Sequence, residues 1–277
     1  MSKSSKSVVL ITGATDGLGK SMAERLATRG WRVLLHGRNA AKGSALCQAL
    51  RENTGNQDVH YFNADLSSLK ETKDFAQAVL DAEPQLDVLV NNAGIGPRAP
   101  ESQRELTPEG HELFFTVNYL SGFLLTRELL PLLQRSKPAR IINVASIGQQ
   151  ALDFDDLMLT QEYDDMRAYR QSKLAQVLAT FDLADELQGS GVTVNCLHPA
   201  TLMPTAMVTN SKFFPGPKAS LEQGVEALDQ LVSAQAMSTV SGAYFDGKQQ
   251  TRADDQAYDR NARAKLRQMS EELIAKV

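Results

Sequence analysis

The sequence predicts a doubly wound α/β fold, in which helices cover both faces of one parallel sheet of about seven strands. Short runs of β-branched and other apolar residues alternate along the chain with longer segments of helical periodicity. This alternation is typical of successive βαβ units, and right-handed crossovers place their helices on both faces of the sheet. No internal repeat, low-complexity tract or linker interrupts the 277 residues, so we expect one domain over 1–277.

Four strands and three helices are predicted in the first third of the chain. The helix after the first strand has its apolar residues on one face and ends at Gly30, as helices commonly end at glycine. Ser67 or Ser68 is suited to cap the third helix. The predicted strands are Val8–Thr12, Arg32–His36, Val59–Phe62 and Asp87–Val90, and the predicted helices are Leu18–Arg29, 40–53 and Ser67–Asp81.

Two long helices are predicted in the rest of the chain. Thr107-Pro108-Glu109 is typical of a helix start and predicts a helix over 107–134. Apolar residues at spacings of three and four predict the other long helix over 165–188. Strands at Arg140–Ala145, Val192–Leu197 and Ala243–Phe245, with helices at 220–236 and from about 254, complete the predicted order.

Composition excludes several classes of protein. Hydrophobic residues make up 42% and charged residues 22%, and a net charge of −4 argues against a nucleic-acid-binding surface. Two cysteines do not form a disulfide framework, so a cytoplasmic protein is the simpler expectation. The polar residues 1–7 precede only four apolar residues, too few for a signal peptide or a membrane anchor.

A glycine-rich turn joins the first strand to the first helix. Glycines allow the backbone to approach a pyrophosphate, and the helix N-terminus offers N–H groups and a partial positive charge. The glycine spacing differs from the common G-x-G-x-x-G by one wider gap, and a turn made only for tight packing is the alternative. The predicted cofactor contacts of this turn are Gly13, Thr15, Asp16, Gly17, Leu18 and Gly19.

The ends of the next three strands carry further candidates. Arg38 stands where NAD-binding sheets usually carry an acid, which favours the 2′-phosphate of NADP(H), although a solvated arginine is the alternative. Asp65, followed by Leu66, can accept from the adenine amino group or cap the following helix. Asn92, Ala93 and Gly94 follow the fourth strand, where they contact the ligand or form a plain turn.

Four side chains are candidates for the chemistry. Tyr169 and Lys173 lie four residues apart and therefore share one helix face. A nearby ammonium lowers the pKa of a phenol, so the pair is suited to proton transfer near pH 7. Asn118 is a polar residue in an apolar helix, either bonded in the core or to a water in the site. Ser146 ends the fifth strand and can hold a substrate carbonyl; it lacks the motif of a nucleophilic serine.

These motifs together resemble the short-chain dehydrogenase/reductase family over nearly the whole chain. The resemblance implies a Rossmann fold with strand order 3-2-1-4-5-6-7. It implies that Tyr169 is the acid/base, that Lys173 binds the nicotinamide ribose and lowers the tyrosine pKa, that Ser146 orients the carbonyl and that Asn118 supports a water relay. It also places Pro199 and Thr201 at the cofactor. The residues that carry the resemblance are Thr12-Gly13-x-x-x-Gly17-x-Gly19, Asn91-Asn92-Ala93-Gly94, Asn118, Ser146 and Tyr169-x-x-x-Lys173.

Within the family, the chain is most similar to the retinol-dehydrogenase and carbonyl-reductase branch, through Arg38, the long segment before Tyr169 and residues 242–245. It departs from the family at Ala200, where a glycine is usual, which leaves the shape of the nicotinamide pocket open. The acidic residues over 153–165 predict a solvated loop, and no metal site is expected. We expect substrate loops at about 147–168 and 200–220, with a roof from 150–165 and from 201–217, including Phe213 and Phe214.

The expected function is an NADP(H)-dependent oxidoreductase that transfers hydride between the nicotinamide and the carbonyl or hydroxyl carbon of a mostly apolar small molecule. One alternative is a nucleotide-sugar epimerase or dehydratase, which also uses Tyr-x-x-x-Lys but usually has a longer C-terminal part. Another is a dinucleotide-binding sensor without turnover. The number of subunits stays open, and a homo-oligomer is among the alternatives.

Overall fold

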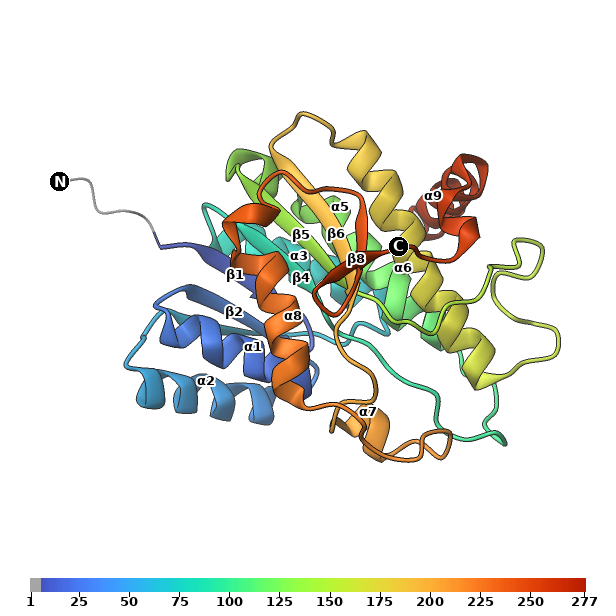
Figure 1. Ribbon diagram of the computed structural model, residues 1–277, viewed down its shortest axis with the longest axis horizontal. Coiled ribbons are helices and arrows are strands. Elements are labelled where there is room, and N and C mark those ends of the chain that lie inside the picture. Colours follow the sequence, from blue (N-terminus) through green and yellow to red (C-terminus); the bar gives the residue numbers. More distant parts are fainter. Residues whose placement is uncertain (1–5) are drawn as a thin grey trace.

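The computed structural model describes residues 6–277 and has the predicted doubly wound architecture (Figure 1). Residues 1–5 lie outside the described residues. They belong to the polar segment 1–7, which we expect not to be a signal peptide. The sheet order is β3-β2-β1-β4-β5-β6-β7-β8, which confirms the order expected for the first seven strands. These seven are parallel, whereas β8 pairs with β7 in the antiparallel direction and extends the sheet beyond the prediction.

Most elements lie within a few residues of their predicted bounds. The strands are β1 (Val8–Ile11), β2 (Arg32–Gly37), β3 (Val59–Asn63), β4 (Val88–Asn91), β5 (Ala139–Val144), β6 (Val192–His198), β7 (Ala243–Asp246) and β8 (Gln249–Thr251). The helices are α1 (Gly17–Thr28), α2 (Ala40–Thr54), α3 (Leu69–Ala82), α4 (Leu113–Phe115), α5 (Ser121–Arg135), α6 (Asp165–Glu186), α7 (Ala206–Thr209), α8 (Leu221–Ser233) and α9 (Arg260–Ile274), with a π turn η1 (Thr116–Leu120) and 3₁₀ turns η2 (Gln235–Met237) and η3 (Asp255–Tyr258).

Both faces of the sheet are buried, as a parallel sheet requires. Val9 and Ile11 of β1 pack with α1, α2 and α8 on one face, while Val8 and Leu10 pack with α3 and α5 on the other. A third cluster joins α6 to the C-terminal helix α9, which lies against its outer side (Figure 1). The strands are therefore fixed from two sides, and their C-terminal ends form one edge on which loops can build a site.

The helix predicted over 107–134 starts too early. Thr107 donates its backbone N–H to the carbonyl of His111, and Gly110 has φ of 81°, so this segment closes a tight turn. The helical path begins only after Glu112, whose carboxylate accepts from the N–H groups of Phe114 and Phe115. Turn chemistry around proline and glycine thus overrides the helix-start pattern. A π turn, η1, then separates α4 from α5.

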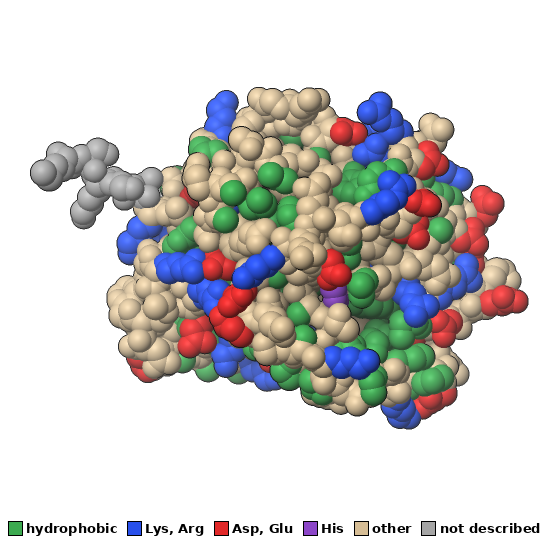
Figure 2. Space-filling model, viewed as in Figure 1, with side chains coloured by type: hydrophobic (Ala, Val, Ile, Leu, Met, Phe, Trp, Pro, Cys, Tyr) green, Lys and Arg blue, Asp and Glu red, His purple; other side chains and the backbone are tan. Residues whose placement is uncertain are grey.

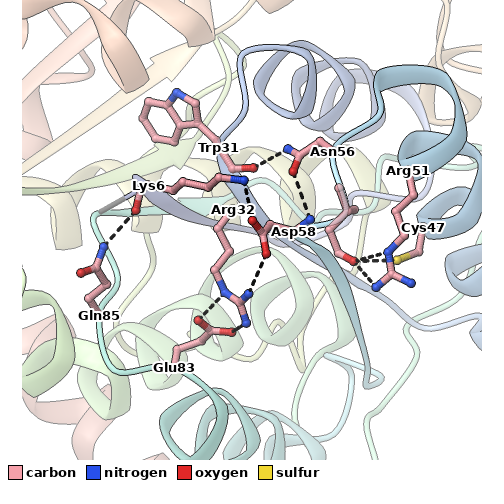
Figure 3. A network of polar contacts seen from close by, with 10 residues as sticks. Lys6, Trp31, Arg32, Cys47, Arg51, Asn56, Asp58, Glu83 and Gln85 are labelled. Atoms are coloured by element: carbon pink, nitrogen blue, oxygen red, sulfur yellow. Dashed lines mark hydrogen bonds and ion pairs between the residues drawn. The ribbon is translucent and has the colours of Figure 1, made fainter. Parts of the chain in front are cut away.

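A polar network holds the N-terminal ends of the strands, opposite the edge with the loops (Figure 3). Arg32 donates two hydrogen bonds of 2.8 Å to the carboxylate of Glu83, whose side chain is almost fully buried at the end of α3. Asp58, just before β3, forms ion pairs with Lys6 and Arg32. The amide of Asn56 donates to the carbonyl of Trp31. These contacts connect β2 and the start of β3 to the end of α3.

The surface has no single-sign character on the face shown in Figure 2, where acidic and basic side chains are interspersed with hydrophobic ones. This agrees with the small net charge of −4. Within residues 6–277, no helix combines the length and the hydropathy that crossing a bilayer would need.

Candidate active site

A cleft of about 800 Å³ lies along the C-terminal edge of the sheet. Loops after six strands, the start of α6 and the segment around α7 line it. Most residues predicted from the sequence are among the lining residues, and two, Gly19 and Asn118, are not. Those that line it are Gly13, Thr15, Asp16, Gly17, Leu18, Arg38, Asp65, Leu66, Asn92, Ala93, Gly94, Ser146, Tyr169, Lys173, Pro199 and Thr201.

The glycine turn after β1 has a backbone that side chains would disturb. Gly13 has φ of 62°, and a Cβ there would lie 2.8 Å from the Cα of Ala93. Gly19 lies behind the turn, where a Cβ would be 2.5 Å from the carbonyl oxygen of Gly13. Asp16 caps α1 by accepting from the N–H of Gly17. The N-terminus of α1 therefore opens toward the cleft, and Gly19 contributes through packing.

Asn92 ties the turn after β4 to the glycine turn. Its side-chain amide donates to the carbonyls of Thr12 and Gly13, at 2.8 and 3.0 Å. In return, the hydroxyl of Thr12 accepts from the backbone N–H groups of Asn92 and Ala93. The two loops therefore form one unit. Asn92 therefore does more than form a plain turn, because it also holds the glycine turn in place.

His36 is a residue of this site that sequence reasoning missed. Its Nδ1 accepts from the N–H of Gly13, at 3.3 Å, and its Nε2 donates to the carbonyl of Ala64, at 3.1 Å. The ring stacks on Phe75 with centroids 4.6 Å apart. Burial lowers the pKa of His36 to about 4, so the imidazole is neutral at neutral pH. The sequence feature that could have indicated this role is a histidine next to the apolar residues 33–35 of β2.

The adenine end of the cleft contains Arg38 and Asp65. Arg38 is exposed, lines the cleft and makes no hydrogen bond or ion pair with another residue of 6–277. The carboxylate of Asp65 accepts from the N–H of Ser67, while the cap of α3 is Ser68. The suggestion that Asp65 caps this helix is therefore wrong. Lys20 is exposed and does not line the cleft.

The candidate catalytic side chains meet around two glycines. A Cβ at Gly94 would lie 3.0 Å from Oδ1 of Asn118 and 3.4 Å from Nζ of Lys173. A Cβ at Gly148 would lie 3.5 Å from Oγ of Ser146 and 3.6 Å from the ring of Tyr169. Helix α6 carries the tyrosine and the lysine on one face, and the serine lies in the loop two residues after β5. The structure thus brings Asn118 and Ser146, which are distant in sequence, to the pair formed by Tyr169 and Lys173.

Burial controls the electrostatics of this group. It lowers the pKa of Lys173 to about 7 and raises the pKa of Tyr169, while a hydrogen bond with Ser146 opposes the latter shift. In the protein alone the net shift of the Tyr169 pKa is therefore upward, opposite to the lowering expected from Lys173. Desolvation penalises the charged form of both groups. The lysine donates to the carbonyl of Val144 and to Oε1 of Gln176, at 2.9 and 3.0 Å.

Asn118 belongs to the support of the site. Its Oδ1 accepts from the N–H of Ile95, and its Nδ2 donates to the carbonyl of Ile95 and to Oγ of Ser172. Ser172 in turn donates to the carbonyl of Tyr169. The amide is therefore satisfied by protein atoms and links the loop after β4 to α6. It lies in the π turn η1, a local distortion that is frequent near functional sites.

The roof predicted over 150–165 is wrong. From the loop between β5 and α6, only its first residues, 145–148, line the cleft, and none of residues 150–165 does. Leu152 and Leu157 instead enter the core between α6 and α9, which draws this loop away from the opening. Most acidic residues of this loop are exposed, as expected for a solvated loop, and the buried exception is the first residue of α6. Asp165 is buried, and both of its oxygens accept from the guanidinium of Arg98.

Two other segments complete the substrate half of the cleft. Residues after β4 contribute apolar side chains that the sequence analysis did not select: Ile95, Leu106, Leu113 and Val117. The segment 201–217 is a wall as predicted, but Phe214 lines the cleft and Phe213 does not. Ala200 avoids the left-handed region, which Leu202 adopts instead with φ of 52°. Replacing the usual glycine by alanine is therefore sterically allowed here.

Known proteins with similar sequences and structures include retinol dehydrogenases and bacterial proteins. Retinol dehydrogenase 13 of Homo sapiens is 39% identical over 281 residues, covering 96% of this chain and 84% of that protein. Retinol dehydrogenase 12 of Homo sapiens is 36% identical over 277 residues, covering 96% and 86%. An uncharacterised protein from Mycobacterium paratuberculosis has a similar crystal structure, with a TM-score of 0.80 and 28% identity over 98% of this chain and 94% of that one.

A protein from Escherichia coli CFT073, assigned as a short chain dehydrogenase and crystallised with NADPH, has a TM-score of 0.71 and 28% identity. The alignment covers 88% of this chain and 97% of that one. The family model described as short chain dehydrogenase matches residues 7–213. Fold, site and sequence therefore agree that this chain belongs to the short chain dehydrogenase family of oxidoreductases, with relatives among the retinol dehydrogenases.

Proposed function

We propose that this protein is an NADP(H)-dependent oxidoreductase that interconverts a carbonyl compound and its alcohol, with Tyr169 as the acid/base. The observation that carries the proposal is the meeting of Ser146, Tyr169 and Lys173 in the same cleft as the glycine turn. Relatives named retinol dehydrogenases and neighbours crystallised with NADPH or NADP support it.

The residues present fit a nicotinamide dinucleotide. The N-terminus of α1 and the close-packed glycines Gly13 and Gly17 suit the pyrophosphate. Arg38, which has no partner among the described residues, suits a 2′-phosphate. Asp65 and the turn at 92–94 line the rest of that path. When bound, the nicotinamide supplies or accepts the hydride.

Tyr169 and Ser146 act on the substrate oxygen. Because burial raises the pKa of Tyr169, the phenol of the protein alone holds its proton at neutral pH. This is the form that donates to a carbonyl oxygen as the alcohol forms, and the reverse direction requires the phenol to take that proton back. The hydroxyl of Ser146 orients the same oxygen. Lys173 brings a nearby positive charge, which favours the phenolate during oxidation.

The lining of the substrate half favours apolar compounds. Ile95, Met166, Met207 and Phe214 form its walls. Leu106 and Ile147 are 53% and 56% exposed, an unusual exposure for aliphatic side chains, and both line the cleft. Apolar walls exclude water and favour aryl or alkyl ketones, aldehydes and their alcohols over sugars.

A carbonyl panel tests this proposal. NADPH oxidation by the purified protein is followed with alkyl and aryl ketones, long aldehydes and polar sugars, and NADP⁺ reduction is followed with the matching alcohols. We expect turnover with the apolar compounds and little with the sugars. If no apolar compound supports turnover in either direction, the proposed activity is wrong.

A further inference from the structure

Lys173 is buried without a negative counter-charge. Its side chain is only 3% exposed, and none of the carboxylates in the described part of the chain lies within ion-pair distance. Its Nζ donates to two neutral oxygens, the carbonyl of Val144 and Oε1 of Gln176. An ammonium has three donors, so one remains free, and Lys173 lines the cleft.

Gln176 supplies the one side-chain acceptor of this ammonium among residues 6–277. It follows Lys173 by three residues on α6, so the two side chains share a helix face. Gln176 is 5% exposed, and its Oε1 lies 3.0 Å from Nζ. A hydrogen bond to the charged form of a buried group favours that form. Removing this amide would leave the carbonyl of Val144 as the remaining protein acceptor.

Gln176 also lines a second, smaller cavity. This cavity of about 30 Å³ lies between α5 and α6 and is lined by Gln176, Asn91, Asn143 and Asp182, among others. Oδ1 of Asn91 is buried and has no hydrogen-bond partner among the described residues. An ammonium only donates hydrogen bonds, so the amide oxygen of Gln176, and not its nitrogen, faces Nζ. Lys173 therefore sets the orientation of the Gln176 amide.

We propose that Gln176 is a positioning residue that holds Lys173 as a charged ammonium, with its free donor directed into the cleft. This inference rests on the proposed function only where it concerns the pH profile of kcat/KM. The cost of burying the charge falls on hydrogen bonds alone, because no ion pair compensates it. Gln176 thus decides both where the ammonium points and up to which pH it stays charged.

Other titratable groups surround the same region and must be separated from Lys173. Tyr169 lies on α6, with its ring centroid 6.0 Å from Nζ. The remaining groups are His198 and Cys196 on β6 and Tyr244 and Asp246 on β7. None of them forms a hydrogen bond with Lys173. A direct measurement on the lysine nitrogen is therefore preferable to activity alone.

The test compares Gln176→Met, which keeps the length of the side chain but removes the acceptor, with Gln176→Glu, which adds a negative charge. Gln171→Met is the matched control, because Gln171 is an equally buried glutamine of α6 that donates to the carbonyl of Ala151, away from Lys173. The pKa of Lys173 is measured by NMR on protein with ¹⁵N-labelled lysine, with Lys173→Met to assign the signal. The pH profile of kcat/KM is recorded in parallel.

We expect Gln176→Met to lower the pKa of Lys173 by about one unit and Gln176→Glu to raise it by about 1–3 units. The alkaline limb of kcat/KM should move in the same two directions, and Gln171→Met should move neither. Unchanged lysine titration in both Gln176 variants would overturn the proposal. If one variant fails to fold by its melting curve, the other still decides. The NMR result stands even if no carbonyl substrate is found, so failure of the proposed function remains distinguishable.

Discussion

The backbone N–H of Gly13 donates to Nδ1 of His36 at 3.3 Å, so a histidine near the end of β2 holds the first residue of the glycine turn. Nδ1 can accept only while it carries no proton, and Nε2 is committed to the carbonyl of Ala64. Burial, which lowers the pKa of His36 to about 4, keeps the ring in this form. The shape of the predicted phosphate site therefore depends on a neutral histidine.

We expect His36 to make the fold less stable in acid. The pKa of His36 in the folded state lies below its ordinary value of about 6.5. Between pH 4 and 6.5 the unfolded chain therefore binds a proton at His36 that the folded chain does not bind. The contribution of His36 to the free energy of unfolding is complete above pH 6.5 and is lost as the pH falls toward 4. This loss amounts to roughly 3 kcal/mol at most. Urea unfolding from pH 4 to 7 measures it.

The control for this experiment is His36→Asn, which keeps an acceptor near the position of Nδ1 but does not titrate. Burial also lowers the pKa of His60, His111 and His198, so the wild type alone cannot isolate one histidine. We expect a shallower dependence of the unfolding free energy on pH in His36→Asn. An identical slope in both proteins would show that His36 titrates normally.

Tyr169→Phe should abolish turnover while cofactor binding stays nearly unchanged. The phenol is the proposed proton donor, and losing a positioned acid typically costs 10²–10⁴-fold in rate. Steady-state kinetics and NADPH binding by fluorescence measure the two effects. Tyr163→Phe is the comparison, because the hydroxyl of Tyr163 donates to Asp165 and does not line the cleft. Wild-type kcat in Tyr169→Phe would refute the assignment.

Arg38→Asp should reverse a preference for NADP(H) over NAD(H). Charge-assisted bonds to a phosphate contribute roughly 1.5–3 kcal/mol, which is about tenfold or more in kcat/KM. Lys20→Asp makes the same change of charge at the fourth residue of α1, outside the cleft lining, and should leave the preference in place. Equal use of both cofactors by the wild type would contradict the role of Arg38.

Phe214→Ala should raise KM for bulky apolar substrates more than for small ones, because Phe214 lines the cleft. Phe213→Ala removes the neighbouring aromatic side chain, which is outside the lining, and serves as the control. Kinetics across a series of ketones of increasing size, with melting curves for both variants, give the answer. A folded Phe214→Ala with unchanged KM throughout the series would exclude this wall from substrate binding.

Arg32→Met should destabilise the protein without altering the active site. It leaves the buried carboxylate of Glu83 without its bidentate partner at the far edge of the sheet (Figure 3). Breaking a fully buried pair on one side typically costs about 3–5 kcal/mol, and we expect a smaller loss here because the Arg32 side chain is 28% exposed. Urea unfolding measures the loss, and Arg32→Met combined with Glu83→Gln should recover part of it. No recovery in the double variant would mean that the arginine contributes through packing.

The succession of strands and helices along the chain, the glycine turn and the pairing of Tyr169 with Lys173 were predictable because each depends on residues that are close in sequence. Alternating apolar runs define βαβ units, and a spacing of four residues places two side chains on one helix face whatever surrounds them. The turn after β1 follows from glycines next to a buried strand. These features need only neighbouring residues, so the sequence by itself determined them.

Tertiary contacts decided the rest. The buried cap of Glu112 on α4 overrode the apparent helix start at Thr107, and the core between α6 and α9 drew Leu152 away from the roof. The raised pKa of Tyr169 and the roles of His36 and Gln176 depend on burial and on partners elsewhere in the fold. Desolvation acts on a group only once distant segments enclose it, which is why residue order alone could not show these features.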